Sequence, residues 1–353
     1  MKSLTVRKIT ALLLCTGLIA MSFTGCKTAV KEEKTEEIEE ETVRIGMTFD
    51  SFVIERWQRD RDVFVSAAKE LGAEVNVQTA NGSIEEQKRH ISYFIQEGMD
   101  VIVIVCIDAD TLSDEVKKAK DAGIKVIAYD RIIRDSNIDL YISFDNEAVG
   151  TCMGEAIVNS GIPVENVVMI GGSLADYNVP MVEEGFRTVM QKNGINVIGD
   201  THCDGWRAEL ASDYMYDNLD LIAQADAIMC GNDNIASQVV SVLAEQRLAG
   251  DVLVVGQDAD MEACQRIVEG TQLMTVYKPV DNLARMAAEC AIKLAKGEPL
   301  EAENVINDGT YDVAYIKLTP IPVTEADMND VIINSGFHMK EDIYLNVPGK
   351  MPQ

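Results

Sequence analysis

The chain has 353 residues and carries 58 acidic against 31 basic side chains, which gives a formal net charge of −27 at pH 7. A charge this negative argues against nucleic acid and against an anionic membrane surface as partners, because their phosphate groups would repel the protein. The chain is long enough for two domains of ordinary size.

The N-terminal segment, residues 1–25, has the features of a targeting sequence. Three basic residues within the first eight positions precede an apolar run over residues 9–23, which ends in small residues and Cys26. The run is too short for a comfortable membrane span. Its end resembles the lipobox of bacterial lipoproteins, which implies a lipoprotein signal peptide over 1–25 and lipid attachment at Cys26. Ordinary secretion with cleavage nearby is the alternative, and both place the protein outside the cytoplasm.

Residues 26–42 form an acidic segment between the leader and the first predicted strand. Positions 27–42 hold seven glutamates and three lysines and almost no apolar side chains. A segment of this composition cannot bury enough surface to order itself, and its like charges repel one another. We therefore expect an extended tether that holds the globular part off a membrane surface.

From residue 43 onward, short apolar runs alternate with amphipathic stretches. The runs are rich in β-branched residues, as in parallel strands that are buried on both faces, and the stretches between them have helical periodicity. Two series of such units predict an α/β protein with two doubly wound, Rossmann-like lobes. The expected strands are 43–49, 74–78, 101–107, 125–129 and 140–144 in the first series, and 167–170, 196–198, 227–230, 252–255 and 273–277 in the second. The clearest helical patterns cover 59–71, 84–97, 112–122 and 235–243.

Polar side chains follow nearly every expected strand in both series. Ligands of open parallel sheets bind beyond the carboxyl ends of the strands, so these side chains are candidates for one shared site. Any one of them alone is typical of a helix N-cap, but their recurrence in both lobes is unusual. The candidates are Arg56, Trp57, Asp130, Arg131, Asp176, Asn178, Trp206, Asn232, Asp258 and Lys278.

Trp57 and Trp206 are the two tryptophans of the chain, one in each predicted lobe. Each is flanked by charged residues at a junction between a loop and a helix. A sugar needs such surroundings, because its C–H faces pack on aromatic rings while its hydroxyl groups bond to ions and amides. Two structural tryptophans remain the alternative interpretation.

The sequence lacks the common signatures of nucleotide, acyl-transfer and metal chemistry. It has no phosphate-binding loop, no dinucleotide fingerprint after a strand and no nucleophile elbow. Its three histidines have no metal-ligand spacing, and the run 258–260 lacks the glycine and glutamate of a calcium-binding loop. We therefore expect neither an enzyme nor a metal nor a cofactor, although spacing alone does not exclude a pair of glycosidase carboxylates.

Six cysteines lie beyond the tether, at positions 106, 152, 203, 230, 264 and 290, and none forms a C-x-x-C pair. Cys106 and Cys230 lie within apolar strand patterns, which favours buried free thiols. One or two disulfides remain the alternative for an exported protein.

Several long segments resemble the D-xylose-binding proteins of bacterial ABC sugar importers, in the pentose-binding branch of the type I periplasmic binding proteins. The resemblance covers residues from about 43 to about 340 and includes ERWQRDRDVF, VQTANGSIEEQ, IKVIAYDRIIRD, YISFDNEAVG, GGSLAD, VGQDAD and GTQLMTVYKP. It implies two lobes joined by a three-strand hinge, with one monosaccharide in the cleft between them. The first lobe would comprise 43–145 and receive 279–308, the second would comprise 146–278 and 309–345, and 346–353 would form a tail.

The resemblance also assigns the strand-end residues as sugar contacts. Arg56 and Trp57 match the first loop of the family, Asp130 and Arg131 its Asp-Arg pair, and Trp206 its second stacking ring. The others that match polar contacts are Asp176, Asn178, Asn232, Asp258 and Lys278. Tyr177 stands where the family usually has asparagine, which leaves the shape of one wall and the identity of the sugar open.

These observations predict a monomeric, lipid-anchored extracytoplasmic protein that binds a monosaccharide, D-xylose first, with glucose or another pentose as alternatives. It would deliver the sugar to an ABC permease. A sugar co-receptor for a membrane histidine kinase is the main rival, and an exported glycosidase is a weaker one. A transcription regulator with the same core would need a helix-turn-helix where this chain has its export signal.

Overall fold

The structure is a computed structural model that describes residues 42–352. The predicted signal peptide, the lipid-attachment site at Cys26 and all but the last residue of the predicted tether lie outside these residues. No helix within 42–352 is long and apolar enough to cross a membrane.

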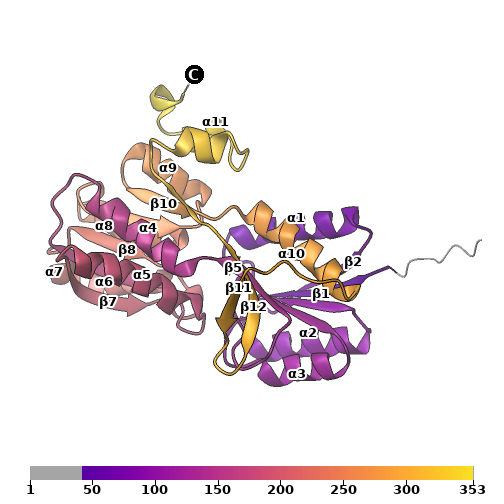
Figure 1. The fold of residues 1–353 in the computed structure, drawn as a ribbon. Coiled ribbons are helices and arrows are strands. Elements are labelled where there is room, and N and C mark those ends of the chain that lie inside the picture. The colour runs from indigo at the N-terminus through magenta and orange to yellow at the C-terminus, as the bar shows by residue number, and fades with distance from the viewer. Residues whose placement is uncertain (1–41, 353) are drawn as a thin grey trace, which may run out of the picture. The chain divides into compact units, whose positions relative to one another are not determined.

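The first lobe is built on a seven-stranded sheet with the strand order β11-β12-β5-β4-β3-β1-β2. All neighbours pair in parallel except β11, an antiparallel edge strand. Helices α1 and α10 pack together on one face, and α2 and α3 cover the other (Figure 1). The strands are β1 (Arg44–Phe49), β2 (Glu74–Thr79), β3 (Val101–Ile104), β4 (Lys125–Tyr129), β5 (Leu140–Phe144), β11 (Asn304–Asn307) and β12 (Asp312–Leu318). The helices are α1 (Arg56–Glu70), α2 (Ile84–Gln96), α3 (Ser113–Asp121) and α10 (Val280–Ala295).

The second lobe is built on a six-stranded sheet with the order β13-β10-β9-β8-β6-β7, parallel except for β13. Helices α4 and α5 cover one face and α6 and α8 the other. The strands are β6 (Asn166–Gly171), β7 (Asn196–His202), β8 (Ala227–Cys230), β9 (Leu253–Gln257), β10 (Met274–Tyr277) and β13 (Ile321–Val323). The helices are α4 (Asn146–Val158), α5 (Asn178–Lys192), η1 (Asp204–Trp206), α6 (Glu209–Asp217), α7 (Leu219–Ile222), α8 (Asp233–Glu245), α9 (Met261–Glu269), η2 (Met328–Ile333), α11 (Lys340–Ile343) and η3 (Pro348–Lys350).

The predicted fold class is confirmed, and strand β6 shows the reason. Val167 and Met169 pack under α4 and α5, while Val168 and Ile170 pack under α6 and α8. Successive side chains of a strand point to opposite faces, so a sheet covered on both faces needs continuous apolar runs of this kind. That pattern is what the sequence displays.

Two glycines allow α4 and α5 to pack unusually close. A Cβ on Gly150 would lie 1.8 Å from the carbonyl oxygen of Val182, and a Cβ on Gly185 would lie 2.0 Å from that of Glu147. The helix backbones are therefore in direct contact. This contact fixes the position of the first turn of α5, which carries Asn178 at its start.

The chain crosses between the two sheets at three places within the described residues: at Asp145, at 278–279 and at 319–320. One predicted boundary is therefore wrong. The sequence predicts that residues 309–345 belong to the second lobe, but β12 pairs in parallel with β5 of the first sheet, with Ile316 opposite Ile142. The hairpin of β11 and β12 completes the first sheet before the chain crosses to the second lobe. The chain therefore enters the second lobe again only at β13.

The predicted strand over 101–107 ends early, at Ile104. The side chain of Gln87, fully buried, donates from Nε2 to Val105 O (2.8 Å) and accepts from Ile107 N (3.0 Å). Buried backbone groups need hydrogen-bond partners, and here the side-chain amide of Gln87 supplies the bonds that a neighbouring strand would otherwise make. The chain turns at this point toward the other lobe, where Ala109 N donates to Ala175 O (2.9 Å).

Candidate functional site

A cavity lies at the carboxyl ends of the strands of both sheets and encloses about 480 Å³ of space, part of it open to solvent. Side chains of both lobes line it. Nine of the ten candidate residues from the sequence lie in its wall: Arg56, Trp57, Asp130, Arg131, Asp176, Asn178, Trp206, Asp258 and Lys278. The sheet topology therefore brings together residues that are more than 200 positions apart.

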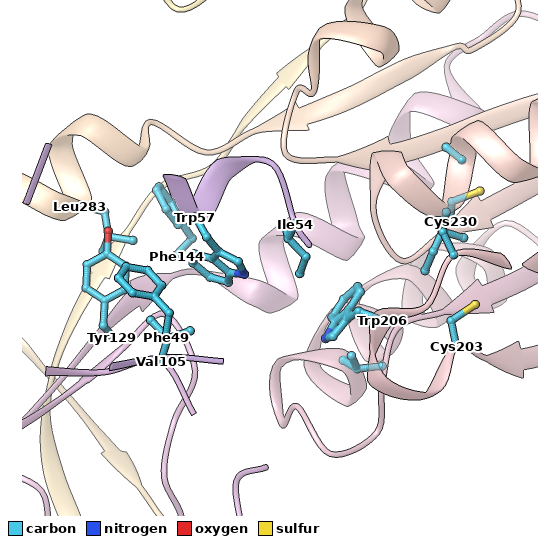
Figure 2. Close-up of a cluster of buried hydrophobic side chains, with 14 of the residues drawn as sticks. Phe49, Ile54, Trp57, Val105, Tyr129, Phe144, Cys203, Trp206, Cys230 and Leu283 are labelled. Carbon is cyan, nitrogen blue, oxygen red and sulfur yellow. The ribbon is translucent and has the colours of Figure 1, made fainter. Parts of the chain in front are cut away.

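The two tryptophans face this cavity from opposite lobes (Figure 2). Trp57 stands in the first turn of α1, which begins at Arg56 and so earlier than the predicted helix. Trp206 ends the short helix η1 after β7 and lies directly on Gly172, where a Cβ would be 2.2 Å from the ring. Gly172 is therefore needed for this ring position. Both rings are nearly buried, with 2% and 9% of their surface exposed.

Arg56 is the centre of a buried charge network in the first lobe. Its guanidinium donates to both carboxylate oxygens of Asp60 (3.2 and 3.1 Å) and forms an ion pair with Asp130 (2.9 Å). Tyr129 also donates its hydroxyl to Asp60. Burial raises the pKa of Asp60. Burial would likewise raise the pKa of Asp130, but Arg56 and the neighbouring cations Lys278 and Arg131 hold it below its usual range.

Arg131 connects the two lobes across the cavity. Its NH1 group bonds to Asp50 and to Cys106 O (3.1 Å) in the first lobe, and its Nε lies 2.7 Å from Asp176 Oδ2 in the second. Its guanidinium carbon is 5.5 Å from the ring centroid of Trp57 and 5.9 Å from that of Trp206. The cation therefore lies close to both rings, where cation–π attraction adds to the ion pairs.

Two further contacts join the lobes at the cavity wall. Asn178 donates from Nδ2 to Asp130 O (3.0 Å), and its Oδ1 accepts from the hydroxyl of Tyr141 (3.1 Å). Asp258 lies 3.4 Å from Lys278 Nζ and 3.9 Å from Arg56. The described conformation is thus one in which the lobes are in contact around the cavity.

Asp130 and Asp258 both occupy left-handed backbone conformations, with φ of 64° and 97°. Such conformations are unfavourable for residues other than glycine and concentrate at functional sites. The backbone amide of each is held by the neighbouring strand: Asp130 N donates to Ile142 O (2.8 Å) and Asp258 N to Val276 O (2.9 Å). The two carboxylates that approach NH1 of Arg56 are therefore placed by strained strand ends.

Buried polar atoms without a hydrogen bond gather at this cavity. Eight residues of the described chain carry such an atom, and six of the eight line the cavity. Four of the six have no partner at all: Trp57 Nε1, Trp206 Nε1, Asn146 Nδ2 and Gln257 Oε1. The other two, Arg131 Nε and Asp258 Oδ1, are in ion pairs with Asp176 (2.7 Å) and Lys278 (3.4 Å). A buried polar group without a partner is costly, so the concentration indicates a ligand rich in hydroxyl groups that bonds to them.

Asn232 and Tyr177 do not line the cavity. The side chain of Asn232 caps α8 by accepting from Ile235 N (2.9 Å), and only its neighbour Gly231 is in the wall. The ring of Tyr177 lies outside, under Arg134 of the first lobe (4.9 Å to the centroid). The expectation that Tyr177 shapes a wall is therefore wrong, because at the N-cap of α5 its side chain points away while Asp176 and Asn178 line the cavity.

Sequence reasoning missed four polar residues of the site: Asn146, Gln257 and Glu183 in the wall, and Asp60 behind Arg56. Asn146 and Gln257 stand at strand ends, so the rule that found the others would have found them. Asp60 is four positions after Arg56 on a helix, a spacing that signals an ion pair. Glu183 is mid-helix and bonds to His202 (2.8 Å), and no sequence signal singles it out.

The described residues offer no group of three or more His, Cys, Asp or Glu side chains that could hold a metal ion. The six cysteines of this region are unpaired, and five are buried. Burial raises the pKa of Cys106 and Cys230, which makes both thiols poor nucleophiles. The polar atoms of the cavity wall can recognise a polar ligand through hydrogen bonds.

Comparison with known proteins gives consistent matches. The family model described as periplasmic binding protein domain matches residues 45–299. The chain is 43% identical over 306 residues to the D-xylose-binding periplasmic protein of Escherichia coli K12, which covers 85% of this chain and 92% of that protein. The corresponding protein of Haemophilus influenzae is 41% identical over 307 residues, with 86% and 92% covered.

Solved structures agree with the fold. A carbohydrate transporter solute-binding protein from Chloroflexus aurantiacus in complex with D-glucose superimposes with a TM-score of 0.78 at 25% identity, covering 86% of this chain and 98% of that one. An ABC transporter solute-binding protein from Clostridium phytofermentans with bound β-D-glucose gives 0.76 at 26% identity, covering 85% and 99%.

Proposed function

Because the chain belongs to the periplasmic binding protein family, a family of binding proteins rather than enzymes, we propose that it captures a monosaccharide outside the cytoplasm. D-xylose is the first candidate, since the relatives at 43% and 41% identity are D-xylose-binding proteins. The protein would deliver the sugar to an ABC permease. D-glucose, bound by the two structural neighbours, is the second candidate ligand.

One observation carries the proposal: four residues with a buried polar atom that has no partner, among them both tryptophans, line a cavity that also holds paired charges. A pyranose offers apolar faces to the rings and hydroxyl groups to the donors and acceptors between them. Hydrogen bonds to charged groups contribute about 1.5–3 kcal/mol each. Several of them, together with the burial of the sugar's apolar faces on the two rings, offset the cost of association and allow an affinity near micromolar, roughly −8 kcal/mol.

Calorimetry tests the proposal directly. We expect D-xylose to bind at one site per chain with a dissociation constant of about 1 μM or lower, and D-glucose, D-ribose, L-arabinose and D-galactose to bind more weakly. Met339→Ala, a change at an exposed residue outside the cavity, is the matched control and should bind like the wild type. Absence of binding to all five sugars by correctly folded protein would refute the assignment.

We further propose that a lipid on Cys26 anchors the protein, as a monomer, to the outer face of the cell membrane. The support is the apolar leader followed by Cys26 and the acidic segment to residue 42. Growth with a radiolabelled fatty acid should label the wild-type protein, and Cys26→Ser should abolish the label. Equal labelling of both proteins would contradict the anchor.

A further inference from the structure

The C-terminal segment returns to the edge of the candidate site. After β13 it packs on α9 and β10 through buried side chains, among them Met328, Ile332 and Tyr344. Phe337 and His338 belong to the same segment, just before α11 (Figure 1). The ring of Phe337 packs against Tyr277 at the end of β10, with 4.8 Å between centroids. Phe337 and His338 are therefore held next to the strand ends that line the cavity.

His338 holds the loop that carries Asp258. The loop is strained, because Asp258 and Ala259 both have positive φ, 97° and 55°. His338 donates from Nε2 to Ala259 O (2.8 Å), while Ala259 N donates to Thr275 Oγ1 (3.1 Å). Ala259, the residue after Asp258, is thus held through both its N–H and its carbonyl group. Burial lowers the pKa of His338, so near neutral pH the ring is uncharged and donates through Nε2–H.

The same segment touches the first lobe. Arg59 of α1 donates to Phe337 O (3.3 Å), and its guanidinium carbon lies 4.6 Å from the centre of the Phe337 ring. Asp281 at the start of α10 orients Arg59 through two hydrogen bonds of 2.6 and 2.8 Å. The contact between Arg59 and Phe337 therefore joins the two lobes in the described conformation.

Neither residue lines the candidate ligand cavity. Phe337 and His338 line a second hollow of about 860 Å³ beside it, and this hollow shares only Arg56 and Asp258 with the first. Any effect of Phe337 or His338 on ligand affinity must therefore pass through Asp258, Arg56 or the contact between the lobes.

We propose that Phe337 and His338 form a clasp, in which His338 positions Asp258 for the ligand and Phe337 stabilises the closed arrangement of the lobes. Both are positioning residues, and neither touches the sugar. The proposal rests on the proposed function in so far as the ligand is a sugar. Binding residues generally keep their geometry through hydrogen bonds from residues outside the site, and His338 gives such a bond to the loop of Asp258.

A double-mutant cycle with Asp258 tests the role of His338. We expect His338→Ala to weaken D-xylose binding about tenfold and to lose this effect in an Asp258→Asn background, because the residue to be positioned is then altered. His338→Gln, which retains a donor, should restore most of the affinity, and Met339→Ala should match the wild type. The same factor of loss in both backgrounds would overturn the proposal, since it would indicate a general structural role.

Hydrogen exchange without sugar separates this proposal from the assignment of the ligand. The amides of residues 258–260 should exchange faster in His338→Ala than in the wild type, whether or not any sugar binds. Unchanged exchange would overturn the positioning role. Failure of wild-type protein to bind any sugar would instead refute the proposed function. The exchange result would still show whether His338 positions the Asp258 loop.

Phe337→Leu tests the other half of the clasp. The leucine keeps apolar packing against Tyr277 but removes the aromatic face below Arg59. We expect D-xylose to dissociate about threefold faster, with the ratio of affinities for D-xylose and D-glucose unchanged. A changed ratio would indicate contact with the sugar itself and would overturn the assignment of Phe337 as a clasp residue.

Discussion

The two lobes contribute unlike halves to one site. In the first lobe, Arg56 is already bonded to Asp60 and Asp130, and Arg131 to Asp50. In the second lobe, Trp206, Asn146 and Gln257 each present an atom to the cavity without a partner, whereas in the first lobe only Trp57 does so among the described cavity residues. The first half is therefore mainly a network of charges that already have partners, whereas the second half holds most of the polar groups that lack one. The comparison suggests that sugar first binds to the first lobe and that the second lobe then closes on it.

The largest effect should come from breaking the network of the first lobe. Arg56→Met leaves Asp60 and Asp130 buried without their main cation, and removal of one partner of a buried ion pair costs about 3–5 kcal/mol. We expect the free energy of unfolding, measured with urea, to fall by this amount and sugar binding to be lost. A stable variant with normal affinity would show that the network is dispensable.

The two tryptophans allow a direct comparison of the lobes, because each lobe contributes one indole ring to the cavity. Trp57→Ala and Trp206→Ala should each weaken D-xylose binding by roughly 2–4 kcal/mol, because each removes one apolar wall of the cavity. Calorimetry measures the loss, and the melting temperature of each variant controls for folding. If both variants bind D-xylose with wild-type affinity, the two rings have a purely structural role.

A substitution that removes the charge of Asp258 should affect ligand binding more than stability, unlike Arg56→Met. Asp258→Asn keeps the size of the side chain but removes the charge that accepts hydrogen bonds, at a cost of about 1.5–3 kcal/mol in sugar affinity. The unfolding free energy should fall less than in Arg56→Met, because the ion pairs of Asp258 with Lys278 and Arg56 are long, 3.4 and 3.9 Å. An equal loss of stability and affinity would contradict the distinction between a prebuilt first half and an unfilled second half.

The last effect concerns pH and the carboxyl group of Asp233, which lies beneath the Asp258 loop. Asp233 accepts from Thr275 Oγ1 (2.6 Å), Gln272 Nε2 (2.8 Å) and Asp260 N (3.2 Å), and burial raises its pKa to about 7. The folded state thus binds a proton that the unfolded state has released above its ordinary pKa of 3.8. Stability from this group is complete below that value and is lost as pH rises through about 7.

Urea denaturation of wild type and Asp233→Asn at pH 5, 6, 7 and 8 measures this loss. The stability advantage of the wild type over the variant should fall between pH 5 and 7 by at most about 1.4 kcal/mol per pH unit and then level off. A constant difference across the series would show that Asp233 keeps one protonation state.

Much of this architecture could be predicted from the sequence because parallel sheets obey local rules. Continuous apolar runs such as Val167–Ile170 mark buried strands, and their carboxyl ends meet at one edge, which is how Arg56 and Lys278 could be assigned to one site. The placement of β12 could not be predicted, because its pattern fits an outer strand of either sheet. Phe337 and His338 could not be found either, since their partners Arg59 and Ala259 are fixed only by the folded chain.

The most direct test of a sugar held between the lobes is the intrinsic fluorescence of the two tryptophans. The chain has no other tryptophan, and both line the cavity. Titration with D-xylose should shift the emission, with a midpoint equal to the calorimetric dissociation constant, because binding removes the remaining water from both rings. Unchanged emission at sugar concentrations that saturate the calorimetric signal would contradict a binding site between Trp57 and Trp206.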